Sequence, residues 1–420
     1  MSPQDRRENG LGGKPAEGIA REPITDLASL LAPCSEEQLV SSFLQKQRLF
    51  VKSGDPRRAA SLLPRWTIDR LIASDFLPAK RLEALRNGEV VAPHLYRTED
   101  GRLRLGALDT LIAEGVSFIV NGIDDDVPAI ARLSDSLERK LGHSVWVNSY
   151  ITHGRGGALP PHYDDHDVIV LQAHGKKRWF GHGAPHPSPI VRSPDGEDFG
   201  PPQWDVLLEP GDVLYLPRGE VHHTSVEGSP SVHLTLGIDT RRGVDFLASI
   251  VETASADERF REDLTRLGGK RALELGERQL KDRMHALIEQ ADLEGYLTSD
   301  DAERALRPLA HLGNAPVMEN SVVVPTPRRP LVVPPHSGDA IDIRTGGQSF
   351  RLSSMAARVL SFLIDHDRST QTELAASLPG DPTEQVVRES VVELVRLGLA
   401  GVEPADDRIP TPDQRPKTKQ

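Results

Sequence analysis

The sequence predicts an α+β protein in which a region of short strands lies between helical regions. Three patterns lead to this prediction. Short apolar runs bounded by Gly, Pro, Asn and Asp occupy about residues 146–239, as is typical of strands joined by turns. Apolar residues recur at helical spacing before this region and again after it. A last unit, about residues 348–404, has three short helical patterns of its own.

The elements follow in order along the chain. Residues 1–24 and 405–420 are polar, and we expect them to be disordered. Residues 25–240 are expected to form one domain, mostly helical to about Arg132 and then rich in short strands, with the loop over residues 183–202 inserted between strands. Asp195, Glu197 and Asp198 on this loop could meet a cationic side chain or simply keep the loop soluble. We expect residues 241–312 to form a helical region. Residues 313–404 are expected to form a linker followed by the last unit.

Composition indicates an ordinary soluble protein of 420 residues, with 38% hydrophobic and 27% charged residues. The single cysteine, Cys34, excludes an intrachain disulfide and favours a reducing compartment. The first residues lack the apolar core of a signal peptide, and no apolar run has the length of a membrane span, so we expect a cytoplasmic protein without membrane contact. The net charge of −12 argues against broad electrostatic binding of nucleic acid and is compatible with a basic polypeptide substrate or with solubility alone.

Three residues suggest a metal site. His162 and Asp164 are two positions apart, so both side chains lie on the same face of an extended strand. His222 lies far enough along the chain to come from another strand. Two imidazoles and one carboxylate leave coordination positions open, which is the ligand set of non-haem iron(II) oxygenases. His-x-Asp alone is a poor signal, because chance produces this triplet often.

The surroundings of His222 strengthen the prediction. Gly211, Pro217, Gly219 and His222 have the spacing G-x5-P-x-G-x2-H, which resembles the second motif of the cupins. Cupins are double-sheet barrels that hold one metal and one small ligand. The segments over residues 159–165, 168–179, 217–222 and 232–236 further resemble the JmjC/cupin oxygenases of the ribosomal oxygenase type, and residues 43–51 are similar to their opening segment.

This resemblance implies a double-stranded β-helix barrel (the cupin, or jelly-roll, JmjC fold) and an iron(II)- and 2-oxoglutarate-dependent hydroxylase that uses O₂ to modify protein side chains. His162, Asp164 and His222 would hold the iron. Lys177 matches the basic residue that binds the distal carboxylate of 2-oxoglutarate, and Asn148, Tyr150 and Thr235 match polar residues of the same pocket. A hairpin turn over residues 173–176 would place Lys177 inside the barrel and Lys176 outside. Without the motif around them, Lys176, Lys177 and Arg178 would be interpreted as a solvated surface run.

The resemblance also implies that residues 241–312 mediate dimerisation and that residues 348–404 form a winged helix, with residues 398–402 as candidates for the wing. A DNA-reading version would need basic residues on its third helix. That helix instead carries Glu384, Arg388, Glu389, Glu393 and Arg396, so direct DNA binding is not expected.

The remaining histidines have plainer interpretations. His223 points to the opposite face from His222, His166 is expected to be solvated or hydrogen-bonded, and His233 to be a core residue. No spacing typical of structural zinc is present.

Several functions stay open at this point. The leading substrate is an Arg or His side chain of a ribosomal protein. Alternatives are a biosynthetic peptide or amino acid, demethylation of methyl-lysine, a zinc-dependent hydrolase or isomerase, and a non-catalytic ligand-sensing regulator that binds DNA.

Overall fold

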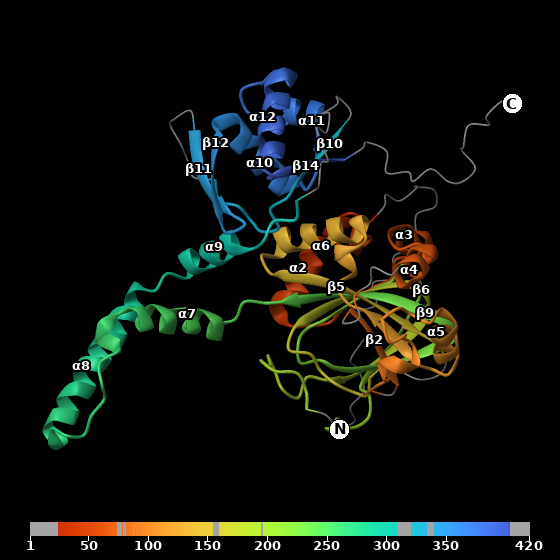
Figure 1. Cartoon of the computed structure of the whole chain (residues 1–420), viewed down its shortest axis with the longest axis horizontal. Helices are drawn as coiled ribbons and strands as arrows, with labels where there is room; N and C mark the ends of the chain where they lie inside the picture. Colours follow the sequence, from red (N-terminus) through yellow and green to blue (C-terminus); the bar gives the residue numbers. More distant parts are fainter. Residues whose placement is uncertain are drawn as a thin grey trace, which may run out of the picture. The chain divides into compact units, whose positions relative to one another are not determined.

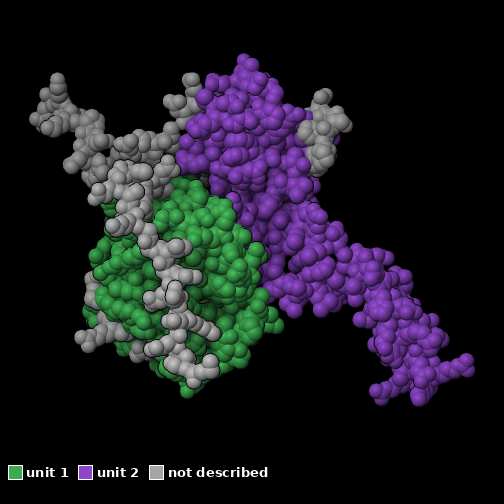
Figure 2. All heavy atoms as spheres, turned by 180° about the vertical axis from the view of Figure 1, so that it is seen from behind, with its two compact units in different colours: residues 1–134, 146–238 green, residues 135–145, 239–420 purple. Residues whose placement is uncertain are grey.

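The computed structural model describes residues 24–73, 78, 81–86, 88–153, 159–194, 196–308, 321–333 and 340–403. The segments predicted to be disordered at both ends lie almost entirely outside these residues. The chain divides into two compact units: one comprises Met1–Ser134 and Trp146–Ile238, the other Asp135–Val145 and Asp239–Gln420 (Figure 2).

The first unit contains the barrel (Figure 1). Its helices are α1 (Leu27–Leu31), α2 (Glu36–Gln45), α3 (Pro56–Leu62), α4 (Arg65–Ala73), α5 (Leu105–Ala113) and the start of α6 (Pro128–Leu141). Its strands are β1 (Leu49–Val51), β2 (Leu82–Arg86), β3 (Glu89–Val90), β4 (Ser117–Val120), most of β5 (Ser144–Thr152), β6 (Asp167–Gly183), β7 (Trp204–Leu208), β8 (Val213–Leu216) and β9 (Val221–Asp239).

The start of the chain is mostly helical, as expected, and it also contributes the short strands β1 to β4, which the sequence did not indicate. β1 pairs with β8, and β4 pairs with β5, so these short segments become strands through partners later in the chain. The described strands follow the order β1-β8-β6-β9-β5-β4-β2-β3, with β7 beside β6. β6 pairs with β9 along nearly its whole length, while its first half pairs with β8 and its second half with β7. β6 is therefore the strand that joins β7, β8 and β9.

The hairpin turn that we predicted over residues 173–176 is wrong. β6 continues through these residues, and its register against β9 shifts on both sides of His174. Gly175 has a φ of +64°, and a Cβ at this position would lie 2.3 Å from the carbonyl oxygen of Pro230. The bulge reverses which residues face inward: Val168 and Val170 before it, and Trp179 after it, all belong to one apolar cluster.

After Asp135–Val145, the second unit continues from Asp239 with helices that bury no residue: α7 (Gly243–Ala256), α8 (Gly269–Gln290) and α9 (Leu293–Glu303). The elements that follow are β10 (Val322–Pro325), β11 (Ala340–Thr345), β12 (Gln348–Ser353), α10 (Ser354–His366), β13 (Ser369–Thr370), α11 (Gln371–Ser377), α12 (Glu384–Arg396) and β14 (Ala400–Glu403). Thr370 and Glu373 form a capping box at the start of α11.

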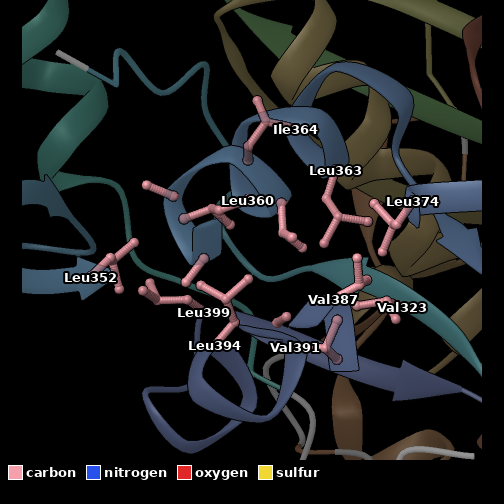
Figure 3. Close-up of a cluster of buried hydrophobic side chains, with 14 of the residues drawn as sticks. Val323, Leu352, Leu360, Leu363, Ile364, Leu374, Val387, Val391, Leu394 and Leu399 are labelled. Carbon is pink, nitrogen blue, oxygen red and sulfur yellow. The ribbon is translucent and has the colours of Figure 1, made fainter. Parts of the chain in front are cut away.

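Figure 3 shows the apolar core of these last elements, in which Leu360 and Leu363 of α10 pack with Val391 and Leu394 of α12 and with Val323 of β10. β13, β10 and β14 form one sheet, and β11 and β12 form a hairpin. Residues 400–403, which overlap the candidate wing, form β14 and pair with β10 inside that sheet. The separate two-stranded hairpin of this part of the chain is β11–β12, which comes before α10 and does not include the candidate wing residues.

Among the described helices, none combines the length and the apolar character needed to cross a bilayer.

Candidate metal and co-substrate site

The structure brings together the three side chains that the sequence suggested. One candidate ligand atom each of His162, Asp164 and His222 lies within 4.8 Å of the other two. Asp164 Oδ2 is 3.8 Å from His222 Nε2, and the two imidazole rings are 4.6 Å apart between centroids. Among the described residues, this is the one group of metal-ligating side chains at such spacing.

Backbone hydrogen bonds hold the two segments together. His162 N donates to His222 O at 3.1 Å, and His222 N donates to His162 O at 2.8 Å. Gly219 N donates to Asp164 O at 3.0 Å. His162 and Asp164 lie before β6 rather than within a strand, and His162 is joined to β9 by an isolated bridge. The predicted strand is therefore reduced to a single bridge, and the pair still meets His222.

Each histidine also has a defined tautomer. His162 Nδ1 lies 2.8 Å from Pro160 O, and His222 Nδ1 lies 3.0 Å from Glu220 O. A carbonyl oxygen only accepts, so each Nδ1 carries the proton and each Nε2 keeps its lone pair. In both cases the carbonyl belongs to the residue two positions earlier. Backbone contacts of this kind commonly orient metal-binding histidines.

The electrostatics of the three residues favour the deprotonated forms that a metal needs. Burial and the neighbouring charge of His162 lower the pKa of His222 to about 4. Burial acts to raise the pKa of Asp164, but the imidazoles of His222 and His162 outweigh it, so this pKa is lowered. Two neutral imidazole nitrogens and a carboxylate are a donor set that suits iron(II).

The three residues line a cavity of about 740 Å³ in the first unit. Lys177 lies in its wall and is only 1% exposed, whereas Lys176 is half exposed and paired with Glu209. Lys177 Nζ is 3.3 Å from Thr152 Oγ1 and 3.3 Å from His233 Nδ1, and no described carboxylate forms an ion pair with it. Burial lowers the pKa of Lys177 to about 7. A buried ammonium without a counter-ion is costly, so the cavity is suited to an anionic ligand.

Asn148, Tyr150 and Thr235, which the sequence selected, also line the cavity. Asn148 Oδ1 accepts a hydrogen bond from Gly122 N at 3.0 Å, which fixes its amide. Tyr150 is stacked on His233, with ring centroids 4.8 Å apart. Burial raises the pKa of Tyr150, and the charges of Asp164 and Glu83 raise it further, so its hydroxyl stays protonated.

The long loop contributes residues that the motifs did not indicate. Ser193 N donates to Tyr163 O at 3.1 Å, and Arg192 and Ser193 line the cavity. The loop's candidate acids are engaged locally: Glu197 contacts His186, and Asp198 accepts from Gly200 N. Asp195 lies outside the described residues.

Other histidines differ in their roles. His223 contacts His182 at 2.9 Å and stacks on Phe180, so it is not one of the three candidate ligands, although it lines the same cavity. His166 lines the cavity with its ring against Trp146. His233, expected to be an ordinary core residue, is buried but faces the cavity beside Lys177. Sequence spacing could have indicated this, because His233 is in phase with Thr235 on one strand.

Comparisons with known proteins agree with this geometry. Residues 125–246 match the JmjC domain family. The chain is 27% identical over 248 residues to the bifunctional lysine-specific demethylase and histidyl-hydroxylase NO66 of Aedes aegypti, covering 57% of this chain and 38% of that protein. It is 41% identical over 108 residues to ribosomal oxygenase 2 of Rattus norvegicus, covering 25% of this chain and 23% of that protein. The chain thus spans less than two fifths of the length of these relatives.

Solved structures of Escherichia coli YcfD share the fold. One described as the ribosomal oxygenase YcfD superposes with a TM-score of 0.52 at 17% identity, covering 88% of this chain and 98% of that one. Another, of YcfD in complex with cobalt and 2-oxoglutarate, has a TM-score of 0.52 at 17% identity and covers 87% and 98%. These likenesses confirm the predicted JmjC, cupin-like fold.

Proposed function

This chain contains a JmjC domain over residues 125–246, and from that premise we propose that it is an iron(II)- and 2-oxoglutarate-dependent oxygenase that hydroxylates a protein side chain. One observation supports the proposal above all others. The same cavity contains an open set of three metal ligands and a buried ammonium that has no carboxylate partner in the described part of the chain. A dicarboxylate 2-oxo acid would fit both features. One end would chelate the metal, and the carboxylate at the other end would pair with the ammonium of Lys177.

The donor set fits the metal. His162, Asp164 and His222 would occupy one face of ferrous iron and leave the opposite face to ligands from solution. When bound, iron(II), 2-oxoglutarate and O₂ together supply the oxidant that inserts oxygen into an unactivated C–H bond. The protein's contribution is to orient the groups and to exclude water.

Lys177 is the residue that we assign to the distal carboxylate of 2-oxoglutarate. Its ammonium is held by Thr152 and His233 and is buried, which strengthens an ion pair relative to one in water. Asn148, Tyr150 and Thr235 complete the polar wall of the same pocket.

For the substrate, we propose an Arg or His side chain of a ribosomal protein. Relatives are named ribosomal oxygenases and histidyl-hydroxylases, and the chain itself is acidic. Glu83 and Glu89 line the cavity together with Asp164, so a basic polypeptide would meet complementary charge. A biosynthetic peptide is the alternative within the same chemistry.

Two further assignments concern the second unit. We propose that α7–α9 mediate homodimerisation, since none of their residues is buried while Leu247, Val251 and Leu275 are more than half exposed. We propose that β10–β14 and α10–α12 form a winged helix that packs or binds a protein. The acidic balance of α12 argues against a DNA-binding regulator, and DNA-binding assays at low salt would detect one.

A reducing, cytoplasmic location is consistent with the single cysteine.

The decisive experiment has two stages. Anaerobically purified protein is loaded with iron(II) and given 2-oxoglutarate and O₂, and succinate is measured. Tryptic masses of ribosomal proteins from cells with and without the enzyme are then compared. A gain of one oxygen on a single peptide, lost with Asp164→Ala, would support the proposal. Absence of succinate formation with iron(II), together with zinc as the metal bound in the anaerobically purified protein, would overturn it in favour of a zinc enzyme.

A further inference from the structure

His233 is held in place by three ring or hydrogen-bond contacts inside the cavity. It lies on β9, is 2% exposed, and has Nδ1 3.3 Å from Lys177 Nζ. Its ring is nearly parallel to that of Tyr150, at an interplanar angle of 11°. The edge of Trp179 meets it at 81°, with ring centroids 5.5 Å apart. These contacts leave the imidazole little freedom to move away from Lys177.

The contact with Lys177 defines the protonation of the ring. An ammonium only donates, so when Lys177 is charged the Nδ1 of His233 accepts and the proton of the neutral ring is on Nε2. Burial lowers the pKa of His233 and the neighbouring charge of Lys177 lowers it further, in keeping with a neutral ring. Among the described residues Nε2 has no hydrogen-bond partner, although the side chain lines the cavity.

The contacts of Lys177 show how the ring of His233 restricts the orientation of the ammonium group. Thr152 Oγ1 and His233 Nδ1 each lie 3.3 Å from Nζ and can each accept one of its protons. A lysine ammonium has three donors. Two are therefore used by described residues of the protein, which leaves one for a ligand in the cavity that Lys177 lines. Without His233, the ammonium would keep one neutral partner and a wider choice of orientations.

We propose that His233 positions Lys177 for the distal carboxylate of 2-oxoglutarate, and that its Nε2–H provides a second donor to the same carboxylate. The inference rests on the proposed function and deepens it. Lys177 and His233 then act as one unit that recognises a dicarboxylate 2-oxo acid, and a 2-oxo acid without the second carboxylate gains nothing from it.

Binding of two ligands to two proteins tests this directly. The wild type and His233→Leu are loaded with manganese(II), and the affinities for 2-oxoglutarate and for 2-oxobutyrate are measured by calorimetry. We expect His233→Leu to weaken 2-oxoglutarate binding about tenfold or more, as for loss of a hydrogen bond to a charged group. Affinity for 2-oxobutyrate should not change, because this compound lacks the distal carboxylate. A merely structural role would weaken both ligands equally.

Two further variants keep the test decisive if His233→Leu does not fold. His233→Asn retains an acceptor near the position of Nδ1, and should recover part of the preference for 2-oxoglutarate. His174→Leu removes a histidine of β6 whose Nε2 contacts Leu63 O outside the cavity, and should leave the preference unchanged. Manganese affinity, measured separately, should be the same in all of these proteins.

The outcomes separate the two proposals. If the wild type does not bind 2-oxoglutarate, the proposed function fails. If the wild type binds it and His233→Leu and His233→Asn show the same ratio of the two affinities as the wild type, the role of His233 is refuted while the proposed function stands.

Discussion

Each imidazole of the proposed iron site donates from Nδ1 to the carbonyl oxygen two residues before it. Such a short local link fixes the tautomer and the ring orientation together. Asp164 is placed by Gly219 N, which binds its carbonyl oxygen, and so its position depends on the segment that carries His222. The positions of the three ligands therefore depend on one another, and loss of any one would leave the metal with only two protein ligands.

Replacing His162 by alanine should reduce iron(II) affinity by more than about a hundredfold, because loss of a group that merely orients a ligand already costs ten- to hundredfold. Anaerobic titration with iron(II) measures this. His186→Ala, a change in an exposed histidine that contacts Glu197, is the matched control and should bind iron like the wild type. Full iron occupancy in His162→Ala would contradict the assignment of the metal ligands.

The affinity for 2-oxoglutarate should depend on pH through Lys177. Burial holds its pKa at about 7 in the free protein, and the carboxylate binds the ammonium form. Below that pKa the ammonium is already formed and affinity should be constant. Above it, each pH unit should weaken binding about tenfold, because a proton must be taken up. Calorimetry between about pH 6 and pH 9 checks this.

Lys177→Arg provides the control for the pH experiment. A guanidinium keeps its proton throughout this range, so the variant should bind 2-oxoglutarate with little dependence on pH. Lys177→Ala should weaken 2-oxoglutarate binding and leave iron binding largely intact. A wild type whose affinity does not change above neutral pH would show that Lys177 is not the group that titrates.

At the scale of the elements, the bulge in β6 decides which side chains face the cavity. Val168 and Lys177 have opposite parity in sequence, and both face the barrel interior because the register shifts near Gly175. An uninterrupted β6 would have directed Lys176 inward instead. The glycine is required because its φ is positive and because Pro230 O leaves no room for a Cβ.

Gly175→Ala should therefore destabilise the first unit by about 2 kcal/mol or more, from the strained φ and the close contact combined. Urea unfolding followed by tryptophan fluorescence measures the loss. Gly106→Ala in α5 is the matched control, because nothing lies within 4 Å of the added methyl group and helices favour alanine. Equal stability of the two variants would show that the bulge tolerates a side chain.

At the scale of the whole molecule, the second unit contains a cluster of buried charges. Glu138, near the end of α6, is fully buried and accepts from Arg304 at 2.5 Å, from Arg328 at 3.1 Å and from Val145 N at 2.8 Å. The contacts connect α6 to the segments on both sides of residues 309–320. A buried carboxylate with several donors is costly to disturb, because its partners would keep uncompensated charge.

Glu138→Gln should destabilise the second unit by about 3–5 kcal/mol, the range for breaking a buried ion pair. Thermal unfolding by calorimetry would reveal a lower transition for this unit. Glu277→Gln on α8 removes a carboxylate from the surface pair with Lys281, and should have no measurable effect. A stable Glu138→Gln protein would mean that solvent already screens the cluster.

The proposed dimer gives the second prediction at this scale. Leu247 and Val251 are four residues apart on α7 and more than half exposed, so they share an apolar face that the described residues leave open. The double change to glutamate should convert a dimer to a monomer in sedimentation equilibrium. Val332→Glu, at another exposed position, should not. A wild type that sediments as a monomer would refute dimerisation itself.

The sequence alone was sufficient for the fold class and for selecting the three ligands that the structure brings within 4.8 Å, because these depend on local spacing and turn chemistry. Lys177 was selected by the motif, although the turn expected beside it is a bulge. The strands β1–β4, the carbonyl partners of the two histidines and the contact of His233 with Lys177 were not predicted. All of these depend on which segments become neighbours, and a strand becomes a strand through a partner far along the chain. Local patterns determined the candidate chemistry of this protein, whereas long-range pairing decided which side chains share one cavity.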